Sequence, residues 1–148
     1  LDGSNRIGRM KADGSEVELD FIELSFDAYL SPLAMLVHDG RLIFSQPATD
    51  SLTELLSVSL DDPTDVHTLT WIASGLLAFD LDLTADGTIL AATGDFGVLL
   101  EVLPDGSKEV VHAAVEYEDA IFSVIGEPSG EVRAFRANGG RPLVHLSL

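Results

Sequence analysis

The chain has no cysteine, few basic residues and no long apolar run. Without cysteine, disulfides and thiolate chemistry are excluded and the redox compartment stays open. No apolar stretch approaches the roughly 18 residues that a membrane-spanning helix needs. The first residues, LDGSNRIGRM, hold neither an initiator methionine nor a basic-then-apolar leader, so we expect a trimmed, processed or excerpted chain without a signal peptide.

Basic residues are scarce relative to acidic ones. The 148 residues include 8 Lys and Arg against 25 Asp and Glu, which gives a formal net charge of −17. A field of this sign repels phosphate backbones and anionic lipids, so we expect neither nucleic-acid nor membrane partners. It is compatible with cationic partners, with divalent metals, or simply with a well-solvated acidic surface. Since 46% of the residues are hydrophobic, we expect a packed core rather than disorder.

Helical periodicity is weak throughout, whereas strand-like alternation recurs between turn signals. In LAFDLDLTADG, apolar residues at 79, 81 and 83 alternate with polar residues at 80, 82 and 84. Asp86-Gly87 then predicts a tight turn, because glycine tolerates positive φ. TILAAT is the expected returning strand, GVLLEVLP the third strand and KEVVHAAV the fourth.

This strand–turn pattern repeats along the chain. Shifted by 43 residues, FDLDLTADGTILAATGDFGVLLEVL lies without gaps over FSVIGEPSGEVRAFRANGGRPLVHL, so that Phe79 falls on Phe122. Upstream, the pair Asp39-Gly40 precedes the pair Asp86-Gly87 by 47 residues. A period of roughly 43–48 residues with four strands in each period is typical of β-propeller blades.

The repeat divides the single expected domain into two complete blades and two incomplete ones. We expect half a blade in residues 1–22, complete blades in 28–71 and 75–115, and three strands of a further blade in 118–148. The expected fold class is all-β, a β-propeller segment of about three four-stranded antiparallel blades that forms half of a closed ring. Because rings close with about 4–8 blades, the apolar faces at both ends need cover.

Two explanations for the incomplete ring stay open. The chain is an excerpt whose missing propeller half lies elsewhere, or two copies associate into one ring. In the second case an N-terminal strand would complete the last blade by edge pairing.

Three stretches resemble repeats of known propellers. SNRIGRMKADGSEVEL resembles the NHL repeat and the YWTD repeat of lipoprotein-receptor propellers, in which an Arg/Lys-Ile pair precedes an Asp-Gly turn. SPLAMLVHDGRLIFS resembles the inner hairpin of the same families, and SGLLAFDLDLTADGTILAAT resembles that of the senescence-marker-protein/gluconolactonase family. The resemblance implies a six-bladed type of propeller and favours a secreted or periplasmic setting.

Asp80 and Asp82 are candidate metal ligands. They share one face of an expected inner strand, and calcium and other hard cations prefer several carboxylate oxygens. The alternative is that they line a wet channel or a blade edge. The resemblance to gluconolactonases implies a divalent ion on inner strands and adds Glu118, which precedes Phe122 by four residues as in the family's Glu-x-Pro-x-Trp start. Ser74 stands where that family has an asparagine ligand, so the sequence departs from its metal site.

A second acidic group surrounds a tyrosine in an expected loop between blades. Glu116, Tyr117, Glu118 and Asp119 are the candidate binding residues for a protein or small-molecule ligand at the channel mouth, because loops on a rigid scaffold commonly carry binding. A merely solvated loop is the alternative. We therefore expect an interaction or ligand-binding scaffold with no catalytic residue of its own. The competing expectation, implied by the resemblance, is a divalent-metal-dependent lactonase or esterase.

Overall fold

The computed structural model consists of β-strands joined by turns. The described residues form thirteen strands in four sheets, with every pairing antiparallel, and they contain no helix. None of them could therefore supply a helix that crosses a membrane. The described residues are 6–23, 32–47, 52–72, 76–94, 97–113, 120–136 and 143–147; for Arg136 and for residues 143–147 the description covers the backbone alone.

The strands follow one another in sequence order within each sheet. The first sheet is the hairpin of β1 (Arg6–Arg9) and β2 (Glu18–Glu23). The second sheet contains β3 (Met35–His38), β4 (Arg41–Pro47), β5 (Thr53–Ser59) and β6 (Val66–Ile72). The third contains β7 (Asp80–Leu83), β8 (Ile89–Ala92), β9 (Val98–Val102) and β10 (Lys108–Ala113). The fourth contains β11 (Ile121–Gly126), β12 (Glu131–Arg136) and β13 (Leu143–Ser147).

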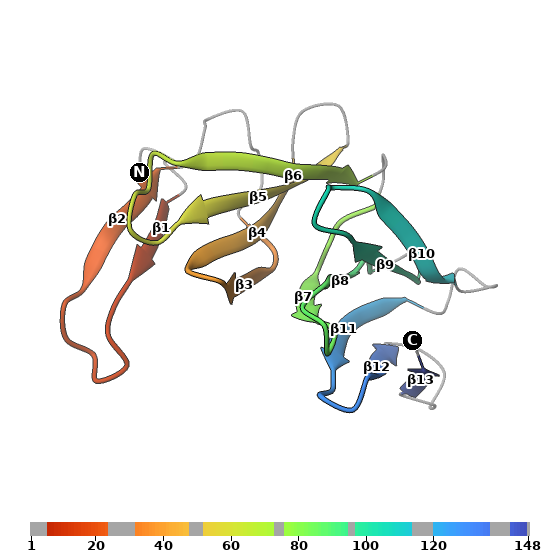
Figure 1. Ribbon diagram of the computed structural model, residues 1–148. Coiled ribbons are helices and arrows are strands. Elements are labelled where there is room, and N and C mark those ends of the chain that lie inside the picture. Colours follow the sequence, from red (N-terminus) through yellow and green to blue (C-terminus); the bar gives the residue numbers. More distant parts are fainter. Residues whose placement is uncertain are drawn as a thin grey trace.

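The four sheets are arranged one after another along an arc. Figure 1 shows β3, β7 and β11 toward the hollow side of this arc, with β6 and β10 on its outer side. Each larger sheet is thus a meander that begins at an inner strand and runs outward. This arrangement confirms the expected fold class, and we call the sheets blades 1 to 4 in chain order.

Two Asp-Gly turns show how local sequence sets these hairpins. Asp39 and Gly40 join β3 directly to β4 with φ of 48° and 71°. Positive φ at both central residues is the geometry that favours Asp-Gly in a two-residue hairpin turn. The connection from β7 to β8 is longer than the tight turn expected there: the Gly87 amide donates to the Thr84 carbonyl, and Gly87 has φ of 87°.

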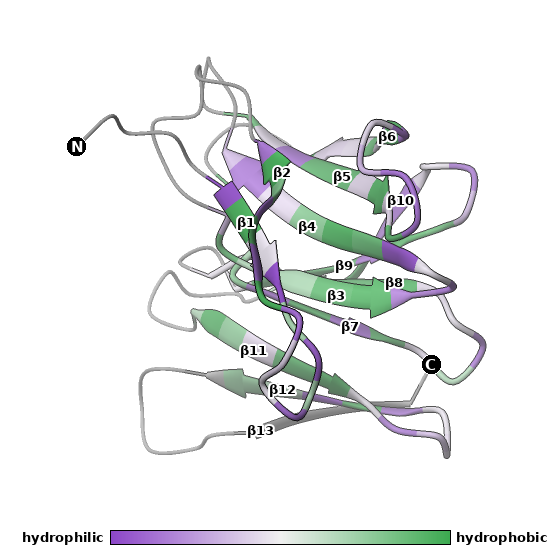
Figure 2. Ribbon diagram, turned by 90° about the vertical axis from the view of Figure 1, so that its left-hand side faces the viewer, coloured by the Kyte–Doolittle hydropathy of each residue, from purple (hydrophilic) through white to green (hydrophobic). Residues whose placement is uncertain are grey.

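The hydrophobic core lies between the blades rather than within one of them. One cluster joins Ile43 and Leu55 of blade 2 to Leu81 and Leu100 of blade 3. Two further clusters join blade 1 to blade 2 and blade 3 to blade 4. Figure 2 shows hydrophobic residues gathered on strands such as β4 and β8, with hydrophilic residues at the turns. Each blade is therefore stabilised mainly by its neighbours, as burial of apolar area requires.

The middle strands are apolar on both faces because blades cover them from both sides. On β4, Leu42 and Phe44 belong to the cluster with blade 1, whereas Ile43 belongs to the cluster with blade 3. On β8, Leu90 packs toward blade 4 and Ile89 toward blade 2. Successive side chains of a strand point to opposite faces, so a strand between two blades buries residues on both of its faces.

Candidate functional site

Asp80 lies at the start of the inner strand β7 and reaches the next blade. Its Oδ2 accepts a hydrogen bond of 2.6 Å from the Ser123 hydroxyl and one of 3.0 Å from the Val124 amide, both on β11. Its Oδ1 accepts from the Leu81 amide at 3.1 Å. Hydrogen bonds to a charged acceptor are the stronger kind, so this carboxylate holds two inner strands together.

Asp82 makes a second contact of the same kind further along β7. Its Oδ2 accepts from the Gly126 amide at 2.9 Å, at the end of β11. Gly126 also marks a very close approach of the two strands: a Cβ placed on it would lie 1.7 Å from the Leu83 carbonyl oxygen. Only glycine fits this approach, so Asp82 and Gly126 together set the spacing of β7 and β11.

The sequence correctly placed Asp80 and Asp82 on an inner strand. The structure brings both to blade 4, whereas Glu118 lies outside the described residues, as do Glu116, Tyr117 and Asp119. Within the described stretches no three His, Asp or Glu side chains form a group that could hold a metal ion. The metal set of Asp80, Asp82 and Glu118 and the binding loop therefore stay predictions.

Sequence reasoning missed Ser123, although a signal for it existed. The 43-residue alignment that shows the repeat places Asp80 over Ser123, and these equivalent positions of adjacent blades are hydrogen-bonded to each other. The same alignment places Phe79 over Phe122, whose rings meet edge to face with centroids 5.1 Å apart. Equivalent residues of neighbouring blades can thus be partners as well as repeats.

Blades 2 and 3 are joined by hydroxyl groups in place of carboxylates. The buried Ser45 hydroxyl donates to the Ala78 carbonyl at 2.8 Å, and the Thr53 hydroxyl donates to the Leu76 carbonyl at 2.8 Å. Both acceptors lie in the segment that leads into β7. These bonds satisfy backbone carbonyl groups outside the strands, as buried backbone requires.

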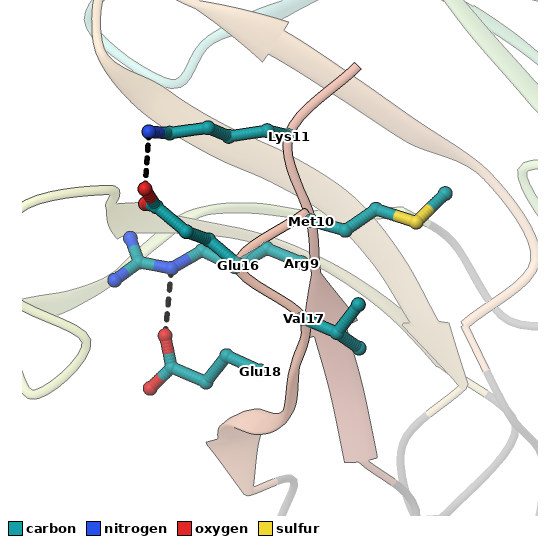
Figure 3. A pocket seen from close by; sticks show the side chains of 6 residues that line it. All are labelled: Arg9, Met10, Lys11, Glu16, Val17 and Glu18. Atoms are coloured by element: carbon teal, nitrogen blue, oxygen red, sulfur yellow. Dashed lines mark hydrogen bonds and ion pairs between the residues drawn. The ribbon is translucent and has the colours of Figure 1, made fainter. Parts of the chain in front are cut away.

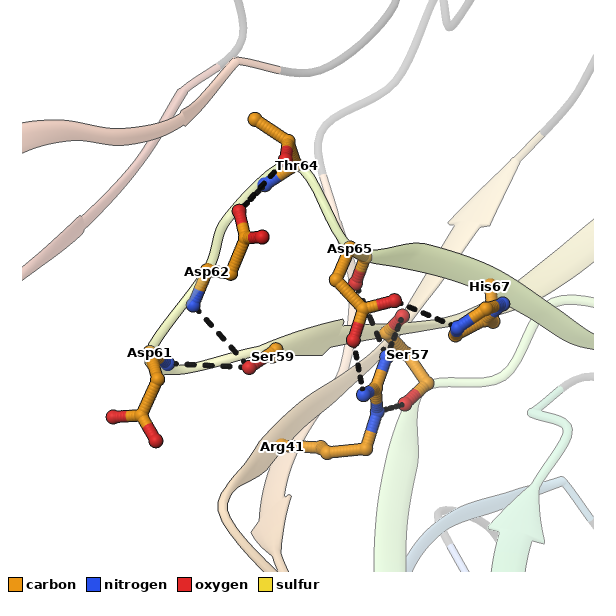
Figure 4. Close-up of polar contacts among 8 residues, drawn as sticks. All are labelled: Arg41, Ser57, Ser59, Asp61, Asp62, Thr64, Asp65 and His67. Atoms are coloured by element: carbon orange, nitrogen blue, oxygen red, sulfur yellow. Dashed lines mark hydrogen bonds and ion pairs between the residues drawn. The ribbon is translucent and has the colours of Figure 1, made fainter.

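A polar cluster stands at the turn between β5 and β6 (Figure 4). Arg41 donates from Nε to the Ser57 hydroxyl at 2.6 Å and from Nη1 to Asp65 Oδ2 at 2.8 Å. His67 Nε2 lies 2.7 Å from Asp65 Oδ1. The hydrogen bond from Arg41 holds the pKa of Asp65 below its usual value, despite the opposing effect of burial. The cluster ties a turn to the sheet.

Four turns use one aspartate in the same way. The carboxylates of Asp13 and Asp105 each accept from the hydroxyl and the amide of the serine two residues later. Asp62 accepts likewise from Thr64, and Asp86 accepts from the hydroxyls of Thr84 and Thr88. Because these bonds favour the ionised form, the pKa of each of the four carboxyls is lowered.

The surface is hollowed along the first hairpin and beside blade 2. A shallow hollow of about 580 Å³ is lined by Arg9, Met10, Lys11, Glu16, Val17 and Glu18. Figure 3 shows its two ion pairs, Arg9–Glu18 and Lys11–Glu16, extending to one side of the hairpin and Met10 and Val17 to the other. A more apolar groove of about 320 Å³ lies between this hairpin and β3, lined in part by Phe21, Met35 and Val37.

Antiparallel meanders stacked face to face around a hollow side define a β-propeller, and this chain is an arc of one. No family model matches the sequence, and no curated protein matches it. Solved structures do. A Bacteroides caccae protein of unknown function is similar over 98% of this chain and 51% of its own, with TM-score 0.65 and 15% identity.

Two further similar structures are a lyase and a WD40 domain. Catalytically inactive virginiamycin B lyase from Staphylococcus aureus, solved with quinupristin, has TM-score 0.62 and 14% identity, covering 84% of this chain and 43% of that one. The WD40 β-propeller domain of Doa1 has TM-score 0.59 and 18% identity, covering 98% and 47%. The chain thus spans about half the length of these structures. At these identities the similarity establishes the propeller fold alone.

Proposed function

We propose that this propeller arc is a binding scaffold rather than a catalyst by itself. The observation that carries the proposal is the use made of Asp80 and Asp82. Their carboxylates, the strongest candidates for chemistry on the inner strands, accept hydrogen bonds from Ser123, Val124 and Gly126 of the next blade. Groups committed in this way make the scaffold rigid, and rigid blades position the loops between them.

The binding residues in this proposal are Glu116, Tyr117, Glu118 and Asp119. In the sequence they follow β10 and precede β11, so they connect blade 3 to blade 4. Three carboxylates around one tyrosine suit a cationic partner, since the tyrosine ring adds cation–π attraction to the charge. The net charge of −17 attracts such a partner from a distance.

A short fluorescently labelled oligolysine peptide tests this assignment by fluorescence anisotropy. Neutralising residues 116–119 with Glu116→Gln, Glu118→Gln and Asp119→Asn should weaken binding about tenfold, because each charge that pairs with the peptide contributes about 0.5 kcal/mol. The matched control, Asp39→Asn, Asp61→Asn and Glu109→Gln, removes the same charge elsewhere and should change affinity by less than about threefold. Equal losses in both triple variants would overturn the loop assignment.

The finer family assignment is also part of the proposal. The Asp-Gly turns and the 43-residue period support kinship with the NHL, YWTD and gluconolactonase-like propellers. Kinship with the gluconolactonase-like propellers supports an alternative function, a divalent-metal-dependent lactonase. Asp80, Asp82 and Glu118 would then be the ligands of the metal ion, and calcium is one candidate ion.

Thermal unfolding with and without calcium separates the two functions. A scaffold should show the same midpoint in calcium and in chelator. A metal enzyme should gain stability with calcium, since a ligand that binds only the folded state raises the midpoint. In that case Glu118→Gln should abolish both the gain and lactone hydrolysis. A calcium-dependent midpoint with lactonase activity would overturn the non-catalytic proposal.

A further inference from the structure

The N-terminal end of the arc leaves part of blade 2 uncovered. The β1–β2 hairpin packs on the outer part of that blade, where Ile7 and Ile22 join Phe44 and Val58 in one cluster. The inner strand β3 receives no such cover from the described residues. Its Met35 and Val37 are 57% and 59% exposed, and they line the groove of about 320 Å³ beside the hairpin.

The C-terminal end of the arc also has an uncovered sheet face, and this face lies on inner strands as β3 does. In blade 4, Val124 and Ala134 are opposite each other and pack against blade 3. The neighbouring positions Ile125 and Phe135 alternate to the other face, where they are 44% and 36% exposed. Since β11 is an inner strand and β12 the second strand, this face occupies the radial level that stands open over β3.

Elsewhere in the arc, each inner strand is covered on one face by the preceding blade. Leu81 of β7 packs in one cluster with Ile43 of blade 2, and Val124 of β11 packs in one cluster with Leu90 of blade 3. The groove over β3 continues the cluster that already joins blade 1 to blade 2, because Ile7, Phe21 and Leu42 belong to both. The expected cover is therefore the inner part of another blade.

We propose that a second copy of this chain supplies that cover. The exposed face of β11 and β12 in one copy stacks on Met35 and Val37 of the other, and a two-fold axis repeats the contact to close the ring. Each composite blade then contains β11, β12 and β13 of one copy and the outer β1–β2 hairpin of the other, which is five strands, one more than blades 2 and 3 contain. Similar solved chains of which this one covers 51%, 43% and 47% have about the length of two copies.

Light scattering after size-exclusion chromatography tests the contact directly. The wild-type chain of 15.8 kDa should elute with twice that mass. Val37→Asp should raise the dissociation constant about 30-fold or more, because it replaces an apolar side chain of the contact by a charged one. Val110→Asp changes a similarly exposed valine on the outer strand β10 and should leave the mass unchanged.

Mixing two damaged copies sharpens the test. Val37→Asp and Ile125→Asp should each give monomers alone, since both contacts of the ring are then damaged. In a dimer of one copy of each variant, the wild-type Val37 of one copy meets the wild-type Ile125 of the other. One of the two contacts is then intact, so a species of two copies should reappear in the mixture. Circular dichroism checks that both variants remain folded.

A wild-type monomer, or larger aggregates without a species of two copies, would overturn the proposal. The proposal would also be overturned if Val110→Asp dissociated the two-copy species as readily as Val37→Asp does. A mixture of Val37→Asp and Ile125→Asp that stays monomeric would overturn it as well. Failure of the oligolysine experiment would leave this result unchanged, because the proposed contact is argued from Met35, Val37, Ile125 and Phe135 and not from residues 116–119.

Discussion

The contact between blades 3 and 4 and the β1–β2 hairpin hold strands together in different ways. Between the blades, Leu90 and Val124 are buried and Asp80 bridges to Ser123. The hairpin packs Ile22 on blade 2, but on its exposed face ion pairs such as Arg9–Glu18 lie at the surface and Leu19 is 74% exposed. Exposed ion pairs contribute little, so the exposed face of the hairpin should add far less stability than the buried contact between blades 3 and 4.

The largest expected difference follows from truncating one leucine in each region. Leu90 is 0% exposed, and Leu90→Ala should lower the free energy of unfolding by about 3 kcal/mol through lost burial and the cavity left behind. Leu19→Ala on the hairpin should change it by less than about 0.5 kcal/mol. Urea unfolding measures both. Similar losses would show that the exposed face of the hairpin stabilises the fold as strongly as the interior.

The inter-blade carboxylate should come next in size. Asp80→Ala leaves the Val124 amide and the Ser123 hydroxyl without their acceptor and should cost about 2 kcal/mol. Asp61→Ala, an exposed turn residue, should cost less than about 0.5 kcal/mol. In a double-mutant cycle, Ser123→Ala should couple to Asp80→Ala but not to Asp61→Ala. Absence of coupling would contradict the bridge.

A smaller effect is expected from cross-strand repulsion in blade 3. Glu101 and Glu109 are directly opposite each other on β9 and β10. Burial, then Asp86 and Glu109, raises the pKa of Glu101, so folding works against its ionised form. Glu101→Gln should stabilise the fold by about 0.5 kcal/mol at neutral pH, as measured by urea unfolding. Because the raised pKa favours the protonated form, this gain should shrink as pH falls through it.

The turn aspartates should give the smallest effect and the opposite pH dependence. Their pKa values are lowered below the ordinary 3.8, so their contribution is present above that pH and is lost as pH falls below it. Replacing Asp13 and Asp105 by asparagine should therefore reduce the fall of the thermal unfolding midpoint with decreasing pH in the acid limb, below about pH 4. An unchanged acid limb would mean that these turns do not affect stability.

The strands and turns were readable from the sequence to a large extent. Alternation at 79–84 and Gly87 predicted β7, a turn with positive φ at Gly87 and β8, because strand periodicity and turn dihedrals depend on adjacent residues, whereas the turn is longer than expected. The shared face of Asp80 and Asp82 was predicted for the same reason. Their partners were not, since a carboxylate on an inner strand suits a metal, a wet channel or a neighbouring blade equally well until the spacing of blades is known.

By itself, the sequence determined the all-β class, the period and the positions of the turns, because each depends on the order of nearby side chains. Only the tertiary structure decided that the core lies between blades, that Asp80 meets Ser123 43 residues away, and that Val37 and Ile125 stay uncovered. These features depend on how sheets stack, and stacking brings together residues that no local pattern links.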